Sequence, residues 1–381
     1  MNNDLLRVFE TESDYDSAKP DFVYPTVSYV RDVDEVYYMT KPWCNYFFIE
    51  ALAVGMTVSL SNSSQGMTAP ANELEYSTDQ QAWTTLPNNT ASPAINTGER
   101  IYLRGNATSA FDMANMMLGI GHFNITQQCN VGGNIMSLLF NDDFEDKTDL
   151  TGYDGAFSGL FIGQPIVDAS ELILPATTLS MGCYFGMFAG CTSLTTAPAL
   201  PATTLSMACY FSMFGNCSSL TTAPALPATT LANECYNQMF RDCTSLTTAP
   251  ALPATTLANE CYGSMFVNCT QLEIAPALPA TTLAKQCYYT MFSGCTSLTT
   301  APALPATTLA DNCYMYMFRG CTNLNYIKML ATDISASTCL SSWVKNVSST
   351  GTFVKNPALS ESTIGRGADG IPEGWTVVDA E

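Results

Sequence analysis

The stretch that decides the fold is LPATTLANECYNQMFRDCTSLTTAPA, residues 226–251. It is one of six copies that repeat every 26 residues and begin at Leu174, Leu200, Leu226, Leu252, Leu278 and Leu304. All copies share L-P-A-T-T-L, followed by C-Y, M-F, C and L at fixed offsets. Because the copies lie in one chain, they can be compared with one another. We expect the fixed positions to form the core and the changing positions to lie on the surface.

The first half of each copy has the spacing of a helix. In the copy that begins at Leu226, the apolar side chains follow a period near 3.6 residues, at Leu231, Cys235, Tyr236, Met239, Phe240 and Cys243. The positions that change between copies lie on the opposite side of a helical wheel. The sequence therefore predicts one α-helix per copy, with its apolar face inward.

The second half of each copy indicates a short strand. Residues 246–253, LTTAPALP, match the L-x-x-L-x-L strand pattern with alanine in two apolar positions. A short parallel strand plus a helix at this period is the plan of a leucine-rich repeat. The predicted fold class is therefore an α/β solenoid, with regular repeats over residues 174–329. Decayed copies on both sides extend the predicted solenoid to residues 134–345.

The regions outside the solenoid have different patterns. Residues 1–44 contain two β-type runs around a turn, which indicates a hairpin or an attachment arm. Residues 45–133 contain short alternating runs separated by Ser, Asn, Gly and Pro clusters, which favours a small β-sandwich-like domain. The Gly-Gly-Asn at 132–134 is interpreted as a turn. Residues 346–381 are expected to form a C-terminal cap.

Composition excludes several classes of function. The chain has 381 residues, one histidine and a net charge of -20, from 14 basic and 34 acidic side chains. So acidic a chain repels phosphate backbones, and we expect no nucleic-acid partner. No apolar run reaches the length of a membrane span, and the first residues lack the basic and apolar parts of a signal peptide. We therefore expect neither membrane insertion nor signal-directed export.

The cysteines follow the repeat, and twelve of the 15 fall in pairs eight residues apart. Equivalent cysteines in adjacent copies would lie about 4.8 Å apart, within disulfide reach. A column of buried, reduced thiols is the interpretation that we favour. The repeats supply no C-x2-C pair and no basic partner for a nucleophilic thiol, and the single His122 lies outside them. We therefore predict a protein that is not an enzyme, with no catalytic residue, metal or cofactor.

Two further chemical possibilities stay open. The acidic residues between 142 and 154 could hold calcium, although their spacing does not match an EF-hand loop, and a solvated acidic loop is the alternative. A polysaccharide hydrolase would need a pair of carboxylates in a groove, and the repeats contain few acids.

Two faces of the predicted solenoid are candidate binding surfaces. Aromatic and arginine side chains are favoured interface anchors, and the predicted outer helix face carries Phe185, Phe211, Asn237, Arg241, Tyr289, Met315, Tyr316 and Arg319. Neutral variation of solvent positions is the alternative. The strand face presents a threonine row, interrupted by Ile274 and Tyr326, that could contact a repeating polymer or be an inert surface.

The repeats resemble the BspA type of leucine-rich repeat, found as 26-residue repeats of bacterial surface proteins. The resemblance covers residues 134–345, and the flanks, such as FEDKTDLTGYDGAFSGLF, are similar to those beside such repeats in gut-bacterial and phage proteins. It implies adhesion or surface recognition rather than catalysis.

Many members of this family carry a secretion signal, and its lack here favours a bacteriophage fibre or receptor-binding protein. Such a protein is assembled in the host cytoplasm and located in the virion. It would bind a bacterial surface glycan or protein through the solenoid, and other virion proteins through its N-terminal region. The alternatives are a structural virion decoration or scaffold protein and a bacterial cell-surface adhesin. A homo-oligomer is possible.

Overall fold

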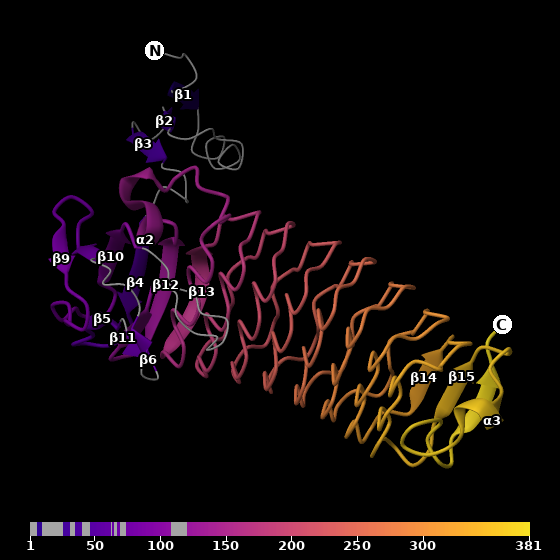
Figure 1. Ribbon diagram of the computed structural model, residues 1–381. Coiled ribbons are helices and arrows are strands. Elements are labelled where there is room, and N and C mark those ends of the chain that lie inside the picture. The colour runs from indigo at the N-terminus through magenta and orange to yellow at the C-terminus, as the bar shows by residue number, and fades with distance from the viewer. Residues whose placement is uncertain are drawn as a thin grey trace.

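The computed structural model describes residues 46–61, 74–107 and 120–381 with their side chains, together with the backbone of a few short strands outside these ranges (Figure 1). Strand β2 (Thr26–Val30) pairs parallel with β1 (Leu6–Phe9) and antiparallel with β3 (Glu35–Met39). Strands β6 (Ser63–Ser64) and β7 (Met67–Thr68) form a small antiparallel pair. The antiparallel pair β2 and β3 lies within the predicted arm, most of which is outside the described residues.

A six-stranded mixed sheet covers the N-terminal end of the stack. Its order is β13-β12-β4-β10-β8-β9, with β4 (Phe47–Ala51), β8 (Leu74–Ser77), β9 (Thr84–Leu86), β10 (Arg100–Gly105), β12 (Cys129–Asn134) and β13 (Ile166–Ile173). A separate antiparallel pair consists of β5 (Val58–Ser61) and β11 (His122–Ile125). In β10, Ile101 and Leu103 are buried and their neighbours half-buried, so one face of the sheet meets the core.

Strand β12 joins this sheet to the repeats. It pairs antiparallel with β4 and parallel with β13, whose Asp168 forms a bridge with Thr196 of the first regular copy. The turn predicted at 132–134 is therefore wrong, because these residues continue β12. Gly132 is required there since a Cβ would lie 2.3 Å from Cζ of Phe48. The boundary predicted between residues 133 and 134 falls inside this strand.

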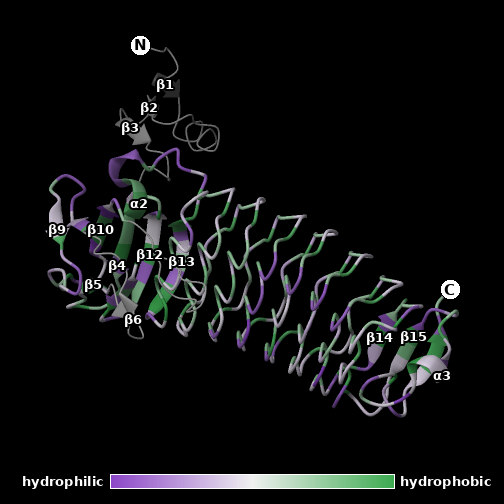
Figure 2. Cartoon of the chain, viewed as in Figure 1, coloured by the Kyte–Doolittle hydropathy of each residue, from purple (hydrophilic) through white to green (hydrophobic). Residues whose placement is uncertain are grey.

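The six copies lie side by side along an extended stack (Figure 1). Parallel bridges join residues that are one copy apart, as between Thr196 and Thr222, Thr222 and Thr248, and Thr230 and Thr256. Pairing is limited to single bridges because the prolines of T-A-P-A-L-P cannot donate to a ladder. Hydrophobic and hydrophilic segments alternate within the coils (Figure 2).

The α-helix predicted for each copy is wrong. Residues 233–242 form consecutive turns instead. Every fourth residue has a positive φ, as in Glu234 (56°), Gln238 (57°) and Asp242 (60°). Every second backbone N–H in this segment donates to the carbonyl oxygen three residues earlier. The N–H of Arg241, for example, donates to the carbonyl oxygen of Gln238 at 3.0 Å.

The other amides donate to the next copy. The N–H groups of Tyr236, Gln238 and Phe240 bind carbonyl oxygens 25 residues later at 3.0, 2.8 and 2.9 Å. We call this segment the turn ladder, which occupies residues 180–191, 206–217, 232–243, 258–269, 284–295 and 310–321. The physical reason is spacing. Helices pack 8–10 Å apart, whereas the stacked rings of Phe214 and Phe240 are 5.7 Å apart.

Two columns of aromatic rings fill the stack. Neighbouring tyrosine rings lie 5.6–6.1 Å apart at Tyr184, Tyr210, Tyr236, Tyr262, Tyr288 and Tyr314. Neighbouring phenylalanine rings lie 5.6–5.8 Å apart at Phe188, Phe214, Phe240, Phe266, Phe292 and Phe318. Both columns end on Trp343, and the phenylalanine column continues through Phe161 to Phe47 of the N-terminal sheet. One continuous core therefore joins the ends of the molecule.

The fourteen cysteines of the described residues are free and buried. The second cysteine of each pair donates its thiol hydrogen to a phenylalanine carbonyl of the previous copy, as Cys243 does to Phe214 at 3.1 Å. Burial raises the pKa of the Cys243 thiol to about 12. The thiol is therefore protonated at neutral pH, fills core volume and satisfies a carbonyl group.

The C-terminal region closes the stack. Strands β14 (Tyr326–Met329), β15 (Thr352–Lys355) and β16 (Thr376–Asp379) form a parallel sheet, and helix α3 (Glu361–Ile364) follows β15. The last coil of the stack has no following copy to accept its backbone N–H groups. Two of them bind residues 368 and 369 instead: the N–H of Ser342 donates to the Asp369 carboxylate at 2.6 Å, and the N–H of Val344 donates to the carbonyl oxygen of Ala368 at 3.2 Å. Residues 368 and 369 therefore cover part of the C-terminal end of the stack.

Candidate functional site

The residues predicted to lie on an outer helix face lie on the turn ladder. Phe185, Phe211, Asn237, Tyr289 and Met315 are one copy apart or multiples of it, and therefore form one column along the stack. The 26-residue register sets this column whatever the local backbone conformation. Tyr316 follows Met315 directly. Arg319 comes three residues after Tyr316, and Arg241 is the equivalent residue three copies earlier.

The N-terminal part of this column is more buried than expected. The rings of Phe185 and Phe211 stack at 4.8 Å, and Phe185 is 9% exposed. Asn237 is 7% exposed, and a Cβ at Gly263 of the next copy would lie 3.0 Å from its Nδ2. Phe185 and Asn237 are therefore buried rather than exposed, because the copies are close enough for each side chain to cover its neighbour.

The C-terminal part of the column forms an aromatic and cationic cluster. The rings of Tyr289 and Tyr316 meet edge to face at 6.1 Å, and the guanidinium of Arg319 lies 5.4 Å from the Tyr316 ring. Met315 lies next to Tyr316 in the chain, is partly exposed like the tyrosines, and Arg319 is exposed. We call Tyr289, Met315, Tyr316 and Arg319 the tyrosine cluster. Rings and a guanidinium are the groups that anchor many interfaces.

Arg241 lies away from this cluster. Its Nε is 3.1 Å from Asp242, and its Nη1 donates to Gln238 at 3.2 Å. Three copies separate Arg241 from Arg319, which is about 14 Å at about 4.8 Å per copy. Four of the eight predicted residues therefore form the tyrosine cluster, whereas Phe185, Phe211, Asn237 and Arg241 lie in earlier copies.

Threonines form two rows on the strand side. The row with Thr196, Thr222 and Thr248 is aligned by bridges and exposed, and Ile274, which is 62% exposed, interrupts it. A second row comes from L-P-A-T-T-L, where Thr204 and Thr230 are exposed although they are identical in all copies. The expectation that fixed positions are core is therefore wrong for these threonines.

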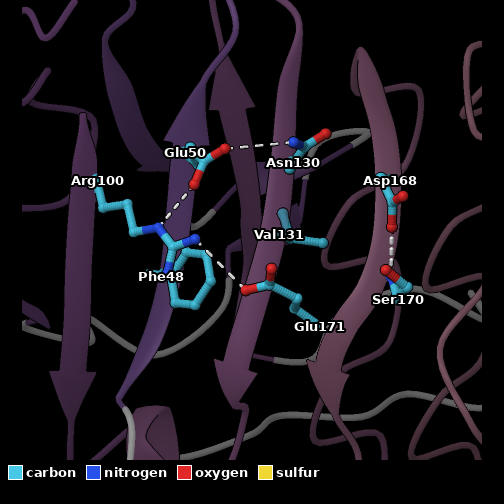
Figure 3. Close-up of a pocket in the computed structure, with 8 residues that line it drawn as sticks. All are labelled: Phe48, Glu50, Arg100, Asn130, Val131, Asp168, Ser170 and Glu171. Carbon is cyan, nitrogen blue, oxygen red and sulfur yellow. Dashed lines mark hydrogen bonds and ion pairs between the residues drawn. The ribbon is translucent and has the colours of Figure 1, made fainter. Parts of the chain in front are cut away.

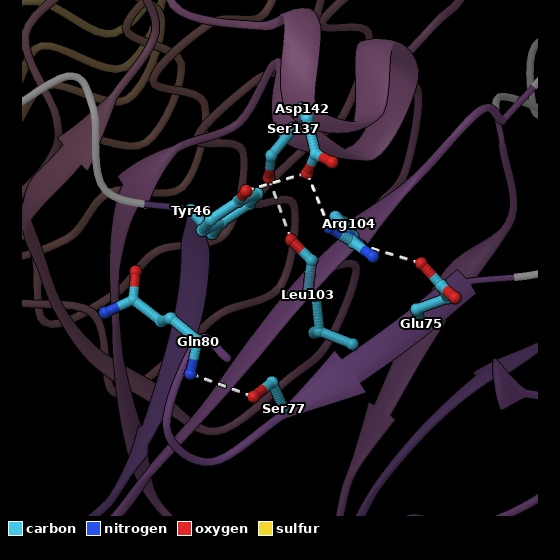
Figure 4. Close-up of polar contacts among 8 residues, drawn as sticks. All are labelled: Tyr46, Glu75, Ser77, Gln80, Leu103, Arg104, Ser137 and Asp142. Atoms are coloured by element: carbon cyan, nitrogen blue, oxygen red, sulfur yellow. Dashed lines mark hydrogen bonds and ion pairs between the residues drawn. The ribbon is translucent and has the colours of Figure 1, made fainter. Parts of the chain in front are cut away.

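A polar cluster at the N-terminal sheet was missed by the sequence analysis (Figure 4). Arg104 from β10 binds Asp142 at 2.5 Å and Glu75 at 2.8 Å, and its guanidinium lies 4.1 Å from the Trp83 ring. The hydroxyl of Tyr46 donates to Asp142 at 2.7 Å. Burial, and then the Asp142 carboxylate, raise the pKa of Tyr46. Nothing in the spacing of these residues in the chain signals that they meet.

The acidic segment considered for calcium has partners of its own. Asp142 lies in the short helix η3 (Asn141–Asp143), which follows α2 (Ser137–Phe140), and binds Arg104. Asp149 accepts from the hydroxyl of Thr151 at 2.6 Å. In the described part of the chain, no three His, Cys, Asp or Glu side chains converge as a metal site.

Comparisons with protein-family models, curated proteins and solved structures found no match to this chain. The resemblance of the repeats to the BspA type therefore stays a prediction. Among the described residues, no helix is long and apolar enough to cross a membrane.

Proposed function

We propose that this chain is a non-catalytic recognition protein, specifically a bacteriophage fibre or receptor-binding protein. The turn ladder would bind a glycan or protein on a bacterial surface. The N-terminal region would attach to other virion proteins, and the protein would act in the virion, outside the cell.

The observation that carries the proposal is the tyrosine cluster on an otherwise regular stack. Core positions of the six copies are nearly identical, whereas the exposed positions of the turn ladder differ between copies. In the last two copies these positions place two tyrosines and an arginine side by side. Hydrogen bonds between copies already fix the backbone that carries these side chains. Binding therefore costs little backbone conformational entropy.

The polar cluster around Arg104 supports a second contact at the N-terminal end. Trp83 and Tyr46 are half-buried, and their rings lie 4.7 Å apart. Aromatic rings beside a guanidinium suit a protein interface. The two clusters lie in different parts of the chain. The cluster around Arg104 could therefore contact the virion while the tyrosine cluster contacts the bacterial surface.

The test is binding of fluorescently labelled protein to a panel of gut bacterial strains. We expect strain-selective binding, and we expect the triple substitution Tyr289→Ala, Tyr316→Ala and Arg319→Ala to reduce it at least about tenfold, because interface anchors often contribute 2 kcal/mol or more each. The melting temperature should change little, since these side chains are partly or fully exposed.

A matched control replaces Thr248, Ile274 and Tyr326 on the strand side, which should leave binding unchanged. If that variant loses binding and the first does not, the binding surface is the threonine row. If wild-type protein binds no strain but retains phage capsid or tail proteins, the structural virion role replaces the proposal. If the protein is found displayed on the surface of the bacterial cells that produce it, the alternative of a bacterial cell-surface adhesin is favoured.

A further inference from the structure

The outward face of the N-terminal sheet holds a polar pocket of about 80 Å³ (Figure 3). Its lining comes from four neighbouring strands of the sheet, β10, β4, β12 and β13, and consists of Phe48, Glu50, Arg100, Asn130, Val131, Asp168, Ser170 and Glu171. These residues are far apart in the chain, and no motif in the sequence connects them.

The backbone at the pocket is irregular. Pairing of β12 with β13 shifts register on both sides of Asn130. Such bulges bend a strand and re-aim its side chains, and here they fall beside Asp168, Ser170 and Glu171. A Cβ at Gly132 would lie 2.9 Å from the Cβ of Glu171 and closer still to the Phe48 ring. The glycine therefore lets both side chains reach their positions.

Three neighbouring side chains hold Arg100 in the pocket wall. Its Nε lies 2.7 Å from Glu50, its Nη2 lies 3.4 Å from Glu171, and its guanidinium lies 4.0 Å from the centre of the Phe48 ring. Asp168 accepts the backbone N–H of Ser170 at 2.6 Å through one oxygen. The second oxygens of Asp168 and Glu171 bond no described residue. The pocket therefore offers a positioned donor beside carboxylate acceptors.

We infer that this pocket binds the edge of a sugar residue through two neighbouring hydroxyl groups. A hydroxyl both donates and accepts, so it can bond a carboxylate and Arg100 at once. The pocket is small beside the roughly 300–1,000 Å³ of pockets that enclose a whole ligand, which suits the edge of a sugar rather than its whole ring. A metal site would require several carboxylates to converge on one point, and among the described residues no such group occurs. The inference rests on the proposed recognition function and adds to the tyrosine cluster a second contact, of stated ligand class, on the N-terminal sheet.

The position of the pocket supports a longer glycan. Asp168 forms a bridge with Thr196, the first threonine of the exposed row. A glycan held by one sugar in the pocket would therefore continue over Thr196 and Thr222.

The test measures binding of free D-glucose, D-galactose, D-mannose and N-acetyl-D-glucosamine to the full chain by saturation-transfer NMR and calorimetry. We expect millimolar binding of at least one sugar. Glu171→Gln should weaken it about tenfold, since a charge-assisted hydrogen bond is lost. The Glu171 side chain is 65% exposed, so the fold should tolerate the change. The matched control, Glu273→Gln on the exposed side of the stack, should bind as wild type does.

Three results would overturn the inference. Binding that is equal in wild type and Glu171→Gln would place the sugar elsewhere. Binding of methylammonium without binding of any neutral sugar would make the pocket a cation site. No sugar binding at all would also reject it, while cell binding that depends on the tyrosine cluster would still stand and keep the proposed function.

Discussion

Exchanging glycine and non-glycine residues at the positive-φ positions of the turn ladder tests the most unexpected feature of this fold. Gln286 has a φ of 56° and Gly186 a φ of 55°. An L-residue in this conformation costs about 1–2 kcal/mol, and a glycine adds about 0.5–1 kcal/mol of unfolded-state entropy. Gln286→Gly should therefore stabilise the protein by about 0.5–1 kcal/mol. Gly186→Ala should destabilise it by a similar amount.

A helix would give the opposite signs. Glycine in a helix interior is about 1 kcal/mol less favourable than alanine, so Gln286→Gly would destabilise and Gly186→Ala would stabilise. Steric contact does not confuse the second test, because a Cβ at Gly186 meets only the Cβ of Ala189 at an ordinary 3.7 Å. The control is Ala189→Gly. Ala189 does not have a positive φ, so this change should destabilise in either conformation.

The measurement is equilibrium unfolding in urea, followed by circular dichroism and by tryptophan fluorescence to detect departures from a two-state transition. A higher midpoint for Gly186→Ala together with a lower one for Gln286→Gly would refute the turn ladder.

Further predictions concern the core and the charged edge of the stack. Cys243→Ala should lower the free energy of unfolding in urea by about 1–2 kcal/mol, because it removes core volume and the thiol donor to Phe214; a stability equal to that of wild type would show that this hydrogen bond contributes nothing. The described cysteines should resist a thiol reagent at pH 8 in the native protein and react after unfolding, because burial raises the pKa of Cys209, Cys243 and Cys261 to about 12; rapid native labelling of any of these three sites, located by mass spectrometry, would contradict their burial. The pKa of Glu234 is raised from 4.5 by burial and then by Glu260, so folding favours its protonated form and its stability contribution is lost as pH rises through the folded-state pKa. Glu234→Gln should therefore raise the melting temperature at pH 7 and not at pH 3.5, and an equal shift at both values would assign the effect to something other than charge.

The sequence predicted which residues of neighbouring copies lie side by side, but it did not predict the backbone conformation within each copy. Spacing at Leu231, Cys235 and Met239 fits a helix, and the turn ladder buries the same side with a four-residue period, so hydrophobic pattern alone does not separate the two. The sequence did carry a signal for positive φ at one of these positions. The residue before the second cysteine is glycine, asparagine or aspartate in every copy, the residue types that adopt positive φ most readily, at Gly190, Asn216, Asp242, Asn268, Gly294 and Gly320.

The candidate sites were less accessible to sequence reasoning. The repeat aligns Tyr289, Tyr316 and Arg319, so their proximity could be predicted. The burial of Phe185 and Asn237 could not, because it depends on the neighbouring copy. The pocket around Arg100 depends on strands that are distant in the chain and on register shifts at Asn130. Such contacts follow from tertiary pairing, which a single sequence does not specify.

The hydrogen bonds between copies make the repeats interchangeable. Each turn ladder offers amides on one side and carbonyl groups on the other, in the same register in every copy. Duplication or loss of one 26-residue unit by recombination would therefore keep this hydrogen-bond register and leave both ends of the stack intact. It would change the distance between the N-terminal sheet and the tyrosine cluster by about 4.8 Å. The stack is in this sense a spacer whose length can evolve in uniform steps without redesign of its ends.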